Sequence, residues 1–264
     1  MLFDGHGDVW TDVTCKRVDH NETDIFRKYH LKKFQAGKVT GGIFVIWIDP
    51  PYDQDPPARS KQIVESIKAE MIDSADLLNF VTKFDDFEKG TKAGKINVVT
   101  GIEGLSQIGE DIDMIDYFYN EVGARHAMLT WNELNALAPG CPQDPTRGLT
   151  EAGKRAVKRM EKLGMVLDVS HLNDKSFWDL MSIATNSRTV CPAKRNLTDD
   201  MLKEIAKTGG LVGMNSLREF VSEKREEQNV QKLCDHLDYI ANLIGIDHIG
   251  LGYDFDDYLG GEAL

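Results

Sequence analysis

The chain has 264 residues, 41% of them hydrophobic, and its 43 acidic residues outnumber its 31 basic residues to give a net charge of −12. This length suits one α/β barrel, and the negative charge argues against nucleic acid or an anionic membrane surface as the main partner. No run approaches the roughly 18 apolar residues of a membrane span, and the four cysteines form no C-x-x-C pair, so we expect free thiols in a reducing cytoplasm.

Short apolar runs typical of strands alternate along the chain with stretches that have helical spacing. Strands are expected over residues 2–3, 42–48, 96–102, 126–131, 165–169, 211–215 and 248–252, and helices over 60–81, 150–163, 173–183, 198–209 and 230–244. Because strands that alternate with helices form parallel sheets, we expect an α/β fold. At this length a closed, TIM-like (β/α)8 barrel is the leading interpretation, and an open doubly wound sheet is the alternative.

The alternation fails once, between the helix that ends near Thr185 and the helix that begins at Thr198. No apolar run lies between them, so the chain supplies seven strands where a closed barrel needs eight. We therefore expect a single barrel domain over residues 1–264 that lacks its sixth strand and its C-terminal helix. Losing a strand would leave the backbone groups of its neighbours unpaired, so a gap in the chain between Thr185 and Asn186 is preferred over a true deletion.

The first strand runs directly into a motif rich in metal-binding side chains, Asp4-Gly5-His6-Gly7-Asp8. Residues two apart in a strand point to the same face, so His6 and Asp8 are expected to lie side by side. An imidazole nitrogen and a carboxylate oxygen at this spacing can hold one divalent metal. Asp-Gly and Gly-Asp are also common turn dipeptides, so the motif alone is a weak signal.

Further polar residues stand where the loops of a barrel build its active site, at the carboxyl ends of the strands. Glu103 is flanked by Gly101 and Gly104 and could bridge two metals, and His171 closes an apolar run. Arg195 precedes a helix and suits bidentate capture of a carboxylate, while Asp254 follows the last strand. Each residue alone could be a helix cap, a turn former or a surface charge, but their recurrence at successive strand ends favours one shared site. His126 begins its strand and is expected to be structural.

These segments together resemble the membrane (renal) dipeptidase family of zinc peptidases, in particular its soluble bacterial members. The similar stretches appear in the order of the family and span nearly the whole chain: DGHGD (4–8), GGIFVIWIDPP (41–51), GIEG (101–104), AMLTWNELNAL (127–137), LDVSHL (167–172), CPAKRNLTDD (191–200) and GIDHIGLGYDFDD (245–257). The resemblance implies a (β/α) barrel with two Zn²⁺ ions and dipeptides as substrates.

The resemblance also implies which residues hold the metal. His6 and Asp8 would bind one zinc, Glu103 would bridge both ions, and His171 would bind the second zinc together with one further histidine. In the family that further histidine ends the strand that is missing here, within a Ser-His-Ser sequence. The second metal site of this chain is therefore expected to be complete only if that strand exists.

The remaining roles follow from the same resemblance. Arg195 matches the residue that binds the substrate carboxylate, and Asp254 matches the acid that assists proton transfer when a metal-bridging hydroxide attacks the peptide bond. Trp131 stands where the animal members carry a histidine near the scissile carbonyl, and it would line the substrate pocket instead. Two alternatives stay open: a metal-dependent amidohydrolase that acts on another small amide, and a degenerate barrel that binds a ligand without turnover. A homo-oligomer is also possible.

Overall fold

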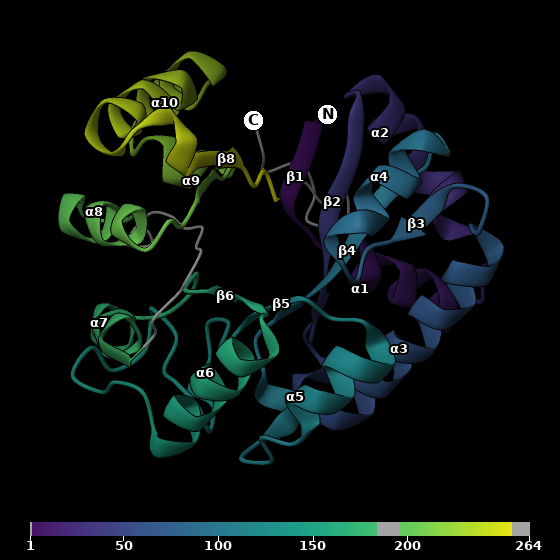
Figure 1. Cartoon of the computed structure of the whole chain (residues 1–264), viewed down its shortest axis with the longest axis horizontal. Helices are drawn as coiled ribbons and strands as arrows, with labels where there is room; N and C mark the ends of the chain where they lie inside the picture. Colours follow the sequence, from purple (N-terminus) through teal and green to yellow (C-terminus); the bar gives the residue numbers. More distant parts are fainter. Residues whose placement is uncertain (1, 184–195, 255–264) are drawn as a thin grey trace.

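Parallel strands form the centre of the computed structural model, which describes residues 2–183 and 196–254 (Figure 1). The strands within these residues are β1 (Leu2–Gly7), β2 (Val39–Trp47), β3 (Leu78–Phe80), β4 (Ile96–Glu103), β5 (His126–Met128), β6 (Val166–Asp168), β7 (Val212–Met214) and β8 (Ile249–Leu251). Six of them pair in the order β3-β4-β2-β1-β8-β7, and β5 pairs with β6. These pairings are all parallel, so the carboxyl ends of the strands lie along one edge.

The two groups of strands adjoin at β4. Ala124, just before β5, forms a parallel bridge with Thr100 of β4, and the Arg125 amide donates a hydrogen bond to the Thr100 carbonyl at 3.0 Å. With the short β3 set aside, the strands follow one another as β6-β5-β4-β2-β1-β8-β7 around an arc, with helices on its outer side (Figure 1). This is the order of strands around a (β/α) barrel, with β6 and β7 at the two ends of the arc. The junction between Thr185 and Asn186, where a sixth strand was predicted to be missing, lies outside the described residues.

Helices follow most strands, as expected for an α/β fold. Within the described residues they are α1 (Val9–Thr14), α2 (Leu31–Ala36), α3 (Pro56–Asp73), α4 (Phe84–Lys92), α5 (Met114–Tyr117), α6 (Glu151–Leu163), α7 (Asp174–Ile183), α8 (Asp199–Lys207), α9 (Arg218–Val221) and α10 (Val230–Ile244). None of these described helices combines the length and the apolar composition that crossing a membrane requires.

The seven predicted strands are confirmed, although β5, β6, β7 and β8 are shorter than expected. The helix predicted over 60–81 is wrong at its end, because α3 stops at Asp73 and Leu78 belongs to β3. The main chain turns at Ser74, whose amide donates to the Glu70 carbonyl at 2.9 Å and whose hydroxyl donates to Glu70 Oε1 at 3.0 Å. The helix α3 therefore ends at a buried serine, although apolar periodicity alone would extend it.

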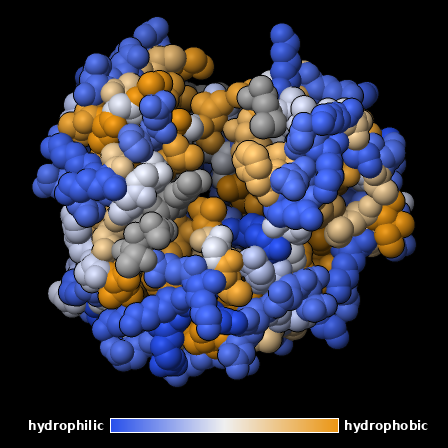
Figure 2. All heavy atoms as spheres, viewed as in Figure 1, coloured by the Kyte–Doolittle hydropathy of each residue, from blue (hydrophilic) through white to orange (hydrophobic). Residues whose placement is uncertain are grey.

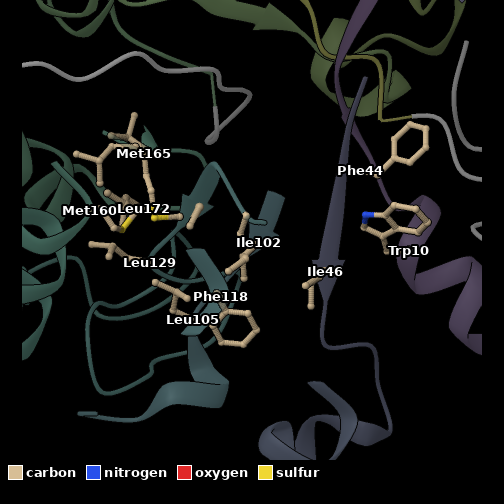
Figure 3. Packing of buried hydrophobic residues seen from close by; sticks show 14 of the residues in the cluster. Trp10, Phe44, Ile46, Ile102, Leu105, Phe118, Leu129, Met160, Met165 and Leu172 are labelled. Carbon is tan, nitrogen blue, oxygen red and sulfur yellow. The ribbon is translucent and has the colours of Figure 1, made fainter. Parts of the chain in front are cut away.

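The hydrophobic core reaches the segment that follows the first strand. Trp10 is fully buried, and its ring meets Phe44 of β2 edge-on at 5.4 Å (Figure 3). The same ring stacks on Phe80 of β3 at 5.7 Å. Burying an aromatic side chain of this size stabilises the fold by roughly 2–3 kcal/mol. Because Trp10 lies in the first turn of α1, this packing fixes where α1 begins and so fixes the position of Asp8 just before it.

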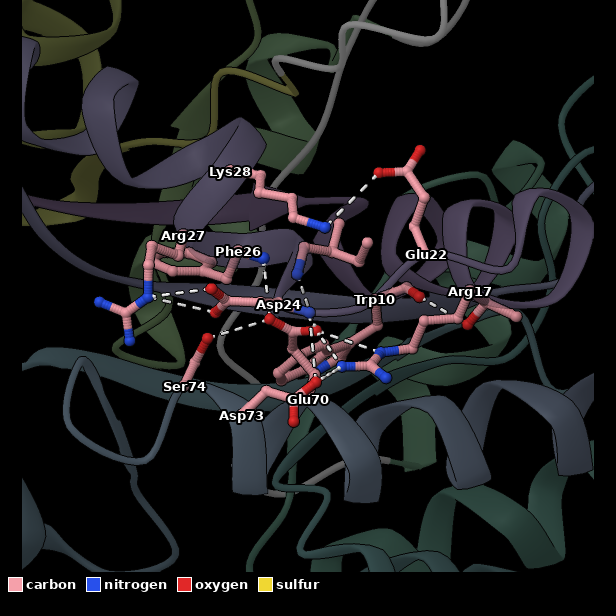
Figure 4. Close-up of polar contacts among 12 residues, drawn as sticks. Trp10, Arg17, Glu22, Asp24, Phe26, Arg27, Lys28, Glu70, Asp73 and Ser74 are labelled. Atoms are coloured by element: carbon pink, nitrogen blue, oxygen red, sulfur yellow. Dashed lines mark hydrogen bonds and ion pairs between the residues drawn. The ribbon is translucent and has the colours of Figure 1, made fainter.

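A buried carboxylate holds the segment between α1 and α2 against α3 (Figure 4). Glu70 of α3 is fully buried, and its oxygens accept hydrogen bonds from the amides of Ile25 and Phe26 at 3.1 and 2.8 Å. The Arg17 guanidinium donates to Glu70 Oε2 from Nη2 at 2.6 Å and from Nε at 3.1 Å. A buried charge is tolerated only when paired and hydrogen-bonded, and these contacts meet that condition.

Candidate metal centre

The predicted site residues lie at the carboxyl ends of different strands. His6 stands near the end of β1, Glu103 is the last residue of β4, and His171 and Asp254 follow β6 and β8. All four side chains meet at one edge of the sheet, where each is within 4.0 Å of another. In the view of Figure 2, hydrophobic residues border the hollow in the middle of the molecule, whereas hydrophilic residues dominate its periphery.

Glu103 lies between the two histidines. Its Oε2 is 3.3 Å from His6 Nε2, and its Oε1 is 2.9 Å from His171 Nε2. Each of these three residues is less than a tenth exposed. One carboxylate therefore presents a different oxygen to each of two imidazoles, an arrangement in which it could bridge two metals bound at the Nε2 atoms.

Two aspartates complete the His6 side of the centre. His6, Asp8 and Asp254 each offer a ligand atom, and these three atoms lie within 4.8 Å of one another. The sequence pattern predicted that Asp8 lies on the strand, and this is wrong. Asp8 lies between β1, which ends at Gly7, and α1, which begins at Val9. Its main-chain carbonyl accepts the first hydrogen bond of α1, from the Asp12 amide at 3.0 Å. The tight turn nevertheless brings Asp8 beside His6.

The site has a strongly negative electrostatic character. Burial alone would lower the pKa of His6, but the nearby charge of Glu103 and the contact between the two side chains raise that pKa to about 10. Burial alone would raise the pKa of Glu103, yet the charge of His6 and the hydrogen bond from His171 hold it well below its usual range. The carboxylates of Asp8, Glu103 and Asp254 thus surround a position that favours positive charge.

This donor set fits a divalent metal. Carboxylate oxygens and imidazole nitrogens are ligands that zinc accepts, and a nearly buried group of carboxylates is costly unless a cation balances its charge. His6, Asp8 and Asp254 could surround one ion, and Glu103 and His171 could contribute to a second. The chemistry of the donors therefore agrees with a metal centre at this edge of the sheet.

Of the two residues predicted to bind substrate, Trp131 lies within the described residues and Arg195 does not. Trp131 follows β5, and its ring centroid lies 6.0 Å from that of His171 and 5.1 Å from that of Trp47, the last residue of β2. The two indoles therefore form an aromatic wall beside the His171 side of the centre. Arg195 lies outside the described residues.

Three polar residues around the centre were not predicted from the sequence. Asn132 Oδ1 is 3.1 Å from His171 Nδ1, and Asn215 Nδ2 donates to Asp254 Oδ2 at 3.0 Å. Asp4 Oδ1 accepts hydrogen bonds from the amides of His6 at 3.3 Å and Tyr253 at 3.0 Å. Asn132 and Asn215 stand next to Trp131 and Met214 at the ends of apolar runs, and this position is the sequence signal for both.

His126, predicted to be structural, pairs with the last residue of β6. Its Nε2 lies 2.9 Å from Asp168 Oδ2, and both side chains are almost completely buried. Burial alone would raise the pKa of Asp168, but the hydrogen bond with His126 holds that pKa below its ordinary value. This pair joins β5 to β6 just before the chain reaches His171.

Comparisons with known proteins agree with this geometry. Residues 1–261 match the model of the family described as membrane dipeptidase (peptidase family M19). The dipeptidase aclJ of Aspergillus oryzae is 26% identical over 97% of this chain and 67% of its own length. Among solved structures, the metallopeptidase named dipeptidase AC is 26% identical with a TM-score of 0.87, over 99% of this chain and 86% of its own.

A second solved structure shows the same fold. It is a metallopeptidase from Rhodobacter sphaeroides liganded with a phosphinate mimic of the dipeptide L-Ala-D-Ala, with 24% identity and a TM-score of 0.86 over 99% of this chain and 87% of its own. The strand order, the polar residues at the strand ends and the match over almost all of the sequence lead to one assignment. The chain belongs to the membrane dipeptidase family, peptidase family M19, and is a metallo-dipeptidase.

Proposed function

We propose that this chain hydrolyses dipeptides with two zinc ions held by His6, Asp8, Glu103 and His171. The observation that supports this most directly is the position of Glu103, whose two oxygens face the Nε2 atoms of His6 and His171 at 3.3 and 2.9 Å. When bound, two such ions lower the pKa of a water molecule between them and so supply a nucleophile at neutral pH.

Asp254 is proposed to move the proton. Its Oδ1 lies 3.7 Å from His6 Nε2, at the centre where the attacking water would lie, and about a third of its side chain is exposed to solvent. A carboxylate in this position can accept the proton of the water and pass it to the leaving amine. Asn215 fixes the other oxygen of this carboxylate through a hydrogen bond of 3.0 Å, so the side chain is oriented before substrate arrives.

The substrate class rests on two features. The pattern around Arg195 favours a guanidinium that binds the free carboxylate at the end of a dipeptide, which a longer peptide would not present at the same place. Trp131 and Trp47 provide an apolar surface beside the His171 side of the centre, suited to a substrate side chain. The dipeptide mimic bound to the Rhodobacter sphaeroides metallopeptidase supports the same class of substrate.

The proposal is tested by removing and restoring the metal. Chelator-treated protein should be inactive and should regain activity with zinc, at two zinc ions per chain by elemental analysis. Dipeptides should be hydrolysed, and tripeptides or C-terminally amidated dipeptides should not. The Glu103→Gln variant should bind at most one zinc, because an amide is a poor bridge between two cations. Full activity in the chelated protein, or two tightly bound zinc ions in Glu103→Gln, would contradict the proposal.

A further inference from the structure

The loop that follows β5 returns to contact the imidazole of His171. Asn132 Oδ1 lies 3.1 Å from His171 Nδ1, although the two residues are 39 positions apart in the sequence. An amide oxygen has no hydrogen to donate, so in this contact the proton must be on Nδ1 of the imidazole. The other ring nitrogen, Nε2, is the one that faces Glu103 at 2.9 Å.

The same loop also fixes the main chain of His171. This residue has a φ of +69°, a left-handed conformation that is uncommon for any residue other than glycine. The Cys141 amide donates a hydrogen bond to the His171 carbonyl at 2.6 Å, and Gly140 forms an antiparallel bridge with Leu172. Strained backbone persists only where neighbouring structure holds it, and the loop after β5 provides that support.

Asn132 is itself held in place before any metal binds. Gln143 Nε2 donates to the Asn132 carbonyl at 2.7 Å, which closes the loop behind the asparagine. On its other side, the Trp131 amide donates to Glu133 Oε2 at 3.2 Å. Because the Asn132 carbonyl is bound by Gln143 and the amide of the preceding residue is also bound, the Asn132 side chain can direct the imidazole at little entropic cost.

We propose that Asn132 is a positioning residue for metal binding by His171. It accepts the Nδ1 proton, which fixes the tautomer and the ring orientation in which the Nε2 lone pair points at the space beside Glu103 Oε1. Partners of this kind commonly raise the affinity of a histidine for its metal. A neutral amide achieves this without adding a further negative charge to a site that already contains three carboxylates. The inference rests on the proposed function, because it assumes a metal at Nε2.

The experiment is a zinc titration of the complete chain, without substrate, by competition with a chromogenic chelator. Wild type is compared with Asn132→Ala, with Asn132→Asp, which restores an acceptor oxygen, and with Asn135→Ala. Asn135 is the matched control, because its side chain holds the same loop through bonds to Leu129, Leu137 and Ala138 rather than to His171.

Asn132→Ala is expected to weaken one of the two zinc sites by about 10- to 100-fold and to leave the other unchanged. Asn132→Asp should restore most of that affinity. Asn135→Ala should lower the melting temperature of the metal-free protein, and its loss of zinc affinity should be much smaller than that of Asn132→Ala. Unchanged zinc affinity in Asn132→Ala, or an equal loss in Asn135→Ala, would overturn the inference while leaving the proposed function intact. A wild-type chain that binds no zinc would overturn both.

Discussion

Asn215 and Asp254 join the ends of two neighbouring strands through one hydrogen bond, from Nδ2 to Oδ2 at 3.0 Å. The asparagine follows β7 and the aspartate follows β8. Because Oδ2 is engaged by the amide, it is Oδ1 that faces His6 Nε2, at 3.7 Å. Asp254 also has a φ of +60°, so its main chain is held in a left-handed conformation that points the carboxylate into the site. Oδ2 therefore holds the side chain in place through Asn215, and Oδ1 faces the site.

The first prediction concerns Asp254→Asn. This change keeps the shape of the side chain but removes the proton acceptor, so kcat should fall by about 10²- to 10⁴-fold. Zinc content should stay near that of wild type if the residue carries protons, and should fall if Asp254 is a necessary ligand of the metal near His6. Turnover and zinc per chain are measured on the same preparation. Near-normal turnover with full zinc would show that the proton travels by another route.

A second prediction tests the carboxylate-binding role proposed for Arg195. Lysine at this position keeps the positive charge but loses the planar pair of donors. If one charge-assisted hydrogen bond worth roughly 1.5 kcal/mol is lost, KM for dipeptides should rise by about tenfold with little change in kcat. Steady-state kinetics of Arg195→Lys provide the measurement, with Lys194→Arg as a neighbouring control that should leave KM unchanged. A KM equal to that of wild type would contradict the role.

The third prediction concerns folding rather than catalysis. Glu70→Ala removes the carboxylate that Arg17, Ile25 and Phe26 share, so two buried amides lose their acceptor and Arg17 keeps only its pair with Asp73. Breaking a buried pair in this way should lower the free energy of unfolding by roughly 3–5 kcal/mol. Urea denaturation measures the change. Glu88→Ala is the control, because the Glu88–Lys92 pair is 72% exposed on both sides and its loss should leave stability almost unchanged.

The fourth prediction is a dependence of stability on pH that involves Asp12. Burial would raise the pKa of this carboxyl, but hydrogen bonds with His30 and Lys16 hold it below the ordinary value of 3.8. The folded state therefore favours the ionised form, and this contribution to stability is fully present above pH 3.8. It is lost as the pH falls through the lower pKa of the folded state.

The matching experiment compares wild type with Asp12→Asn. An asparagine cannot ionise, so the variant should be less stable than wild type at pH 7, and the difference should shrink in acid. Free energies of unfolding in urea at pH 7, 5 and 3 give the comparison. A difference that stays constant over this range would show that the charge of Asp12 does not contribute to stability.

Apolar runs predicted most of the fold because buried parallel strands must be apolar on both faces. They failed at Leu78, which lies at helical spacing from Ile63 and Met71 and yet belongs to β3. Periodicity cannot reveal where a helix ends when the residue at its C-terminal cap is a serine, Ser74, rather than a glycine or a proline. The end of α3 is thus a tertiary property that the sequence pattern does not display.

The candidate site, like the fold, could be predicted from the sequence only in part. His6, Glu103, His171 and Asp254 could be placed together because they end strands, and strand ends of a parallel sheet share one edge. The contact between Asn132 and His171 could not be predicted, because it depends on the path of a loop that runs from Trp131 to Gly140 and back. Chemistry at strand ends can be inferred from order along the chain, whereas the residues that orient this chemistry depend on loop conformation.

The hydrogen bond from the Tyr253 amide to Asp4 Oδ1 spans 249 residues, so the two ends of the described chain meet at the site. During translation, His6 and Asp8 leave the ribosome long before Asp254 does. Until then β1 lacks β8 as a neighbour and presents an open edge. The three donors around His6 therefore come together only after β8 has been synthesised and has paired with β1.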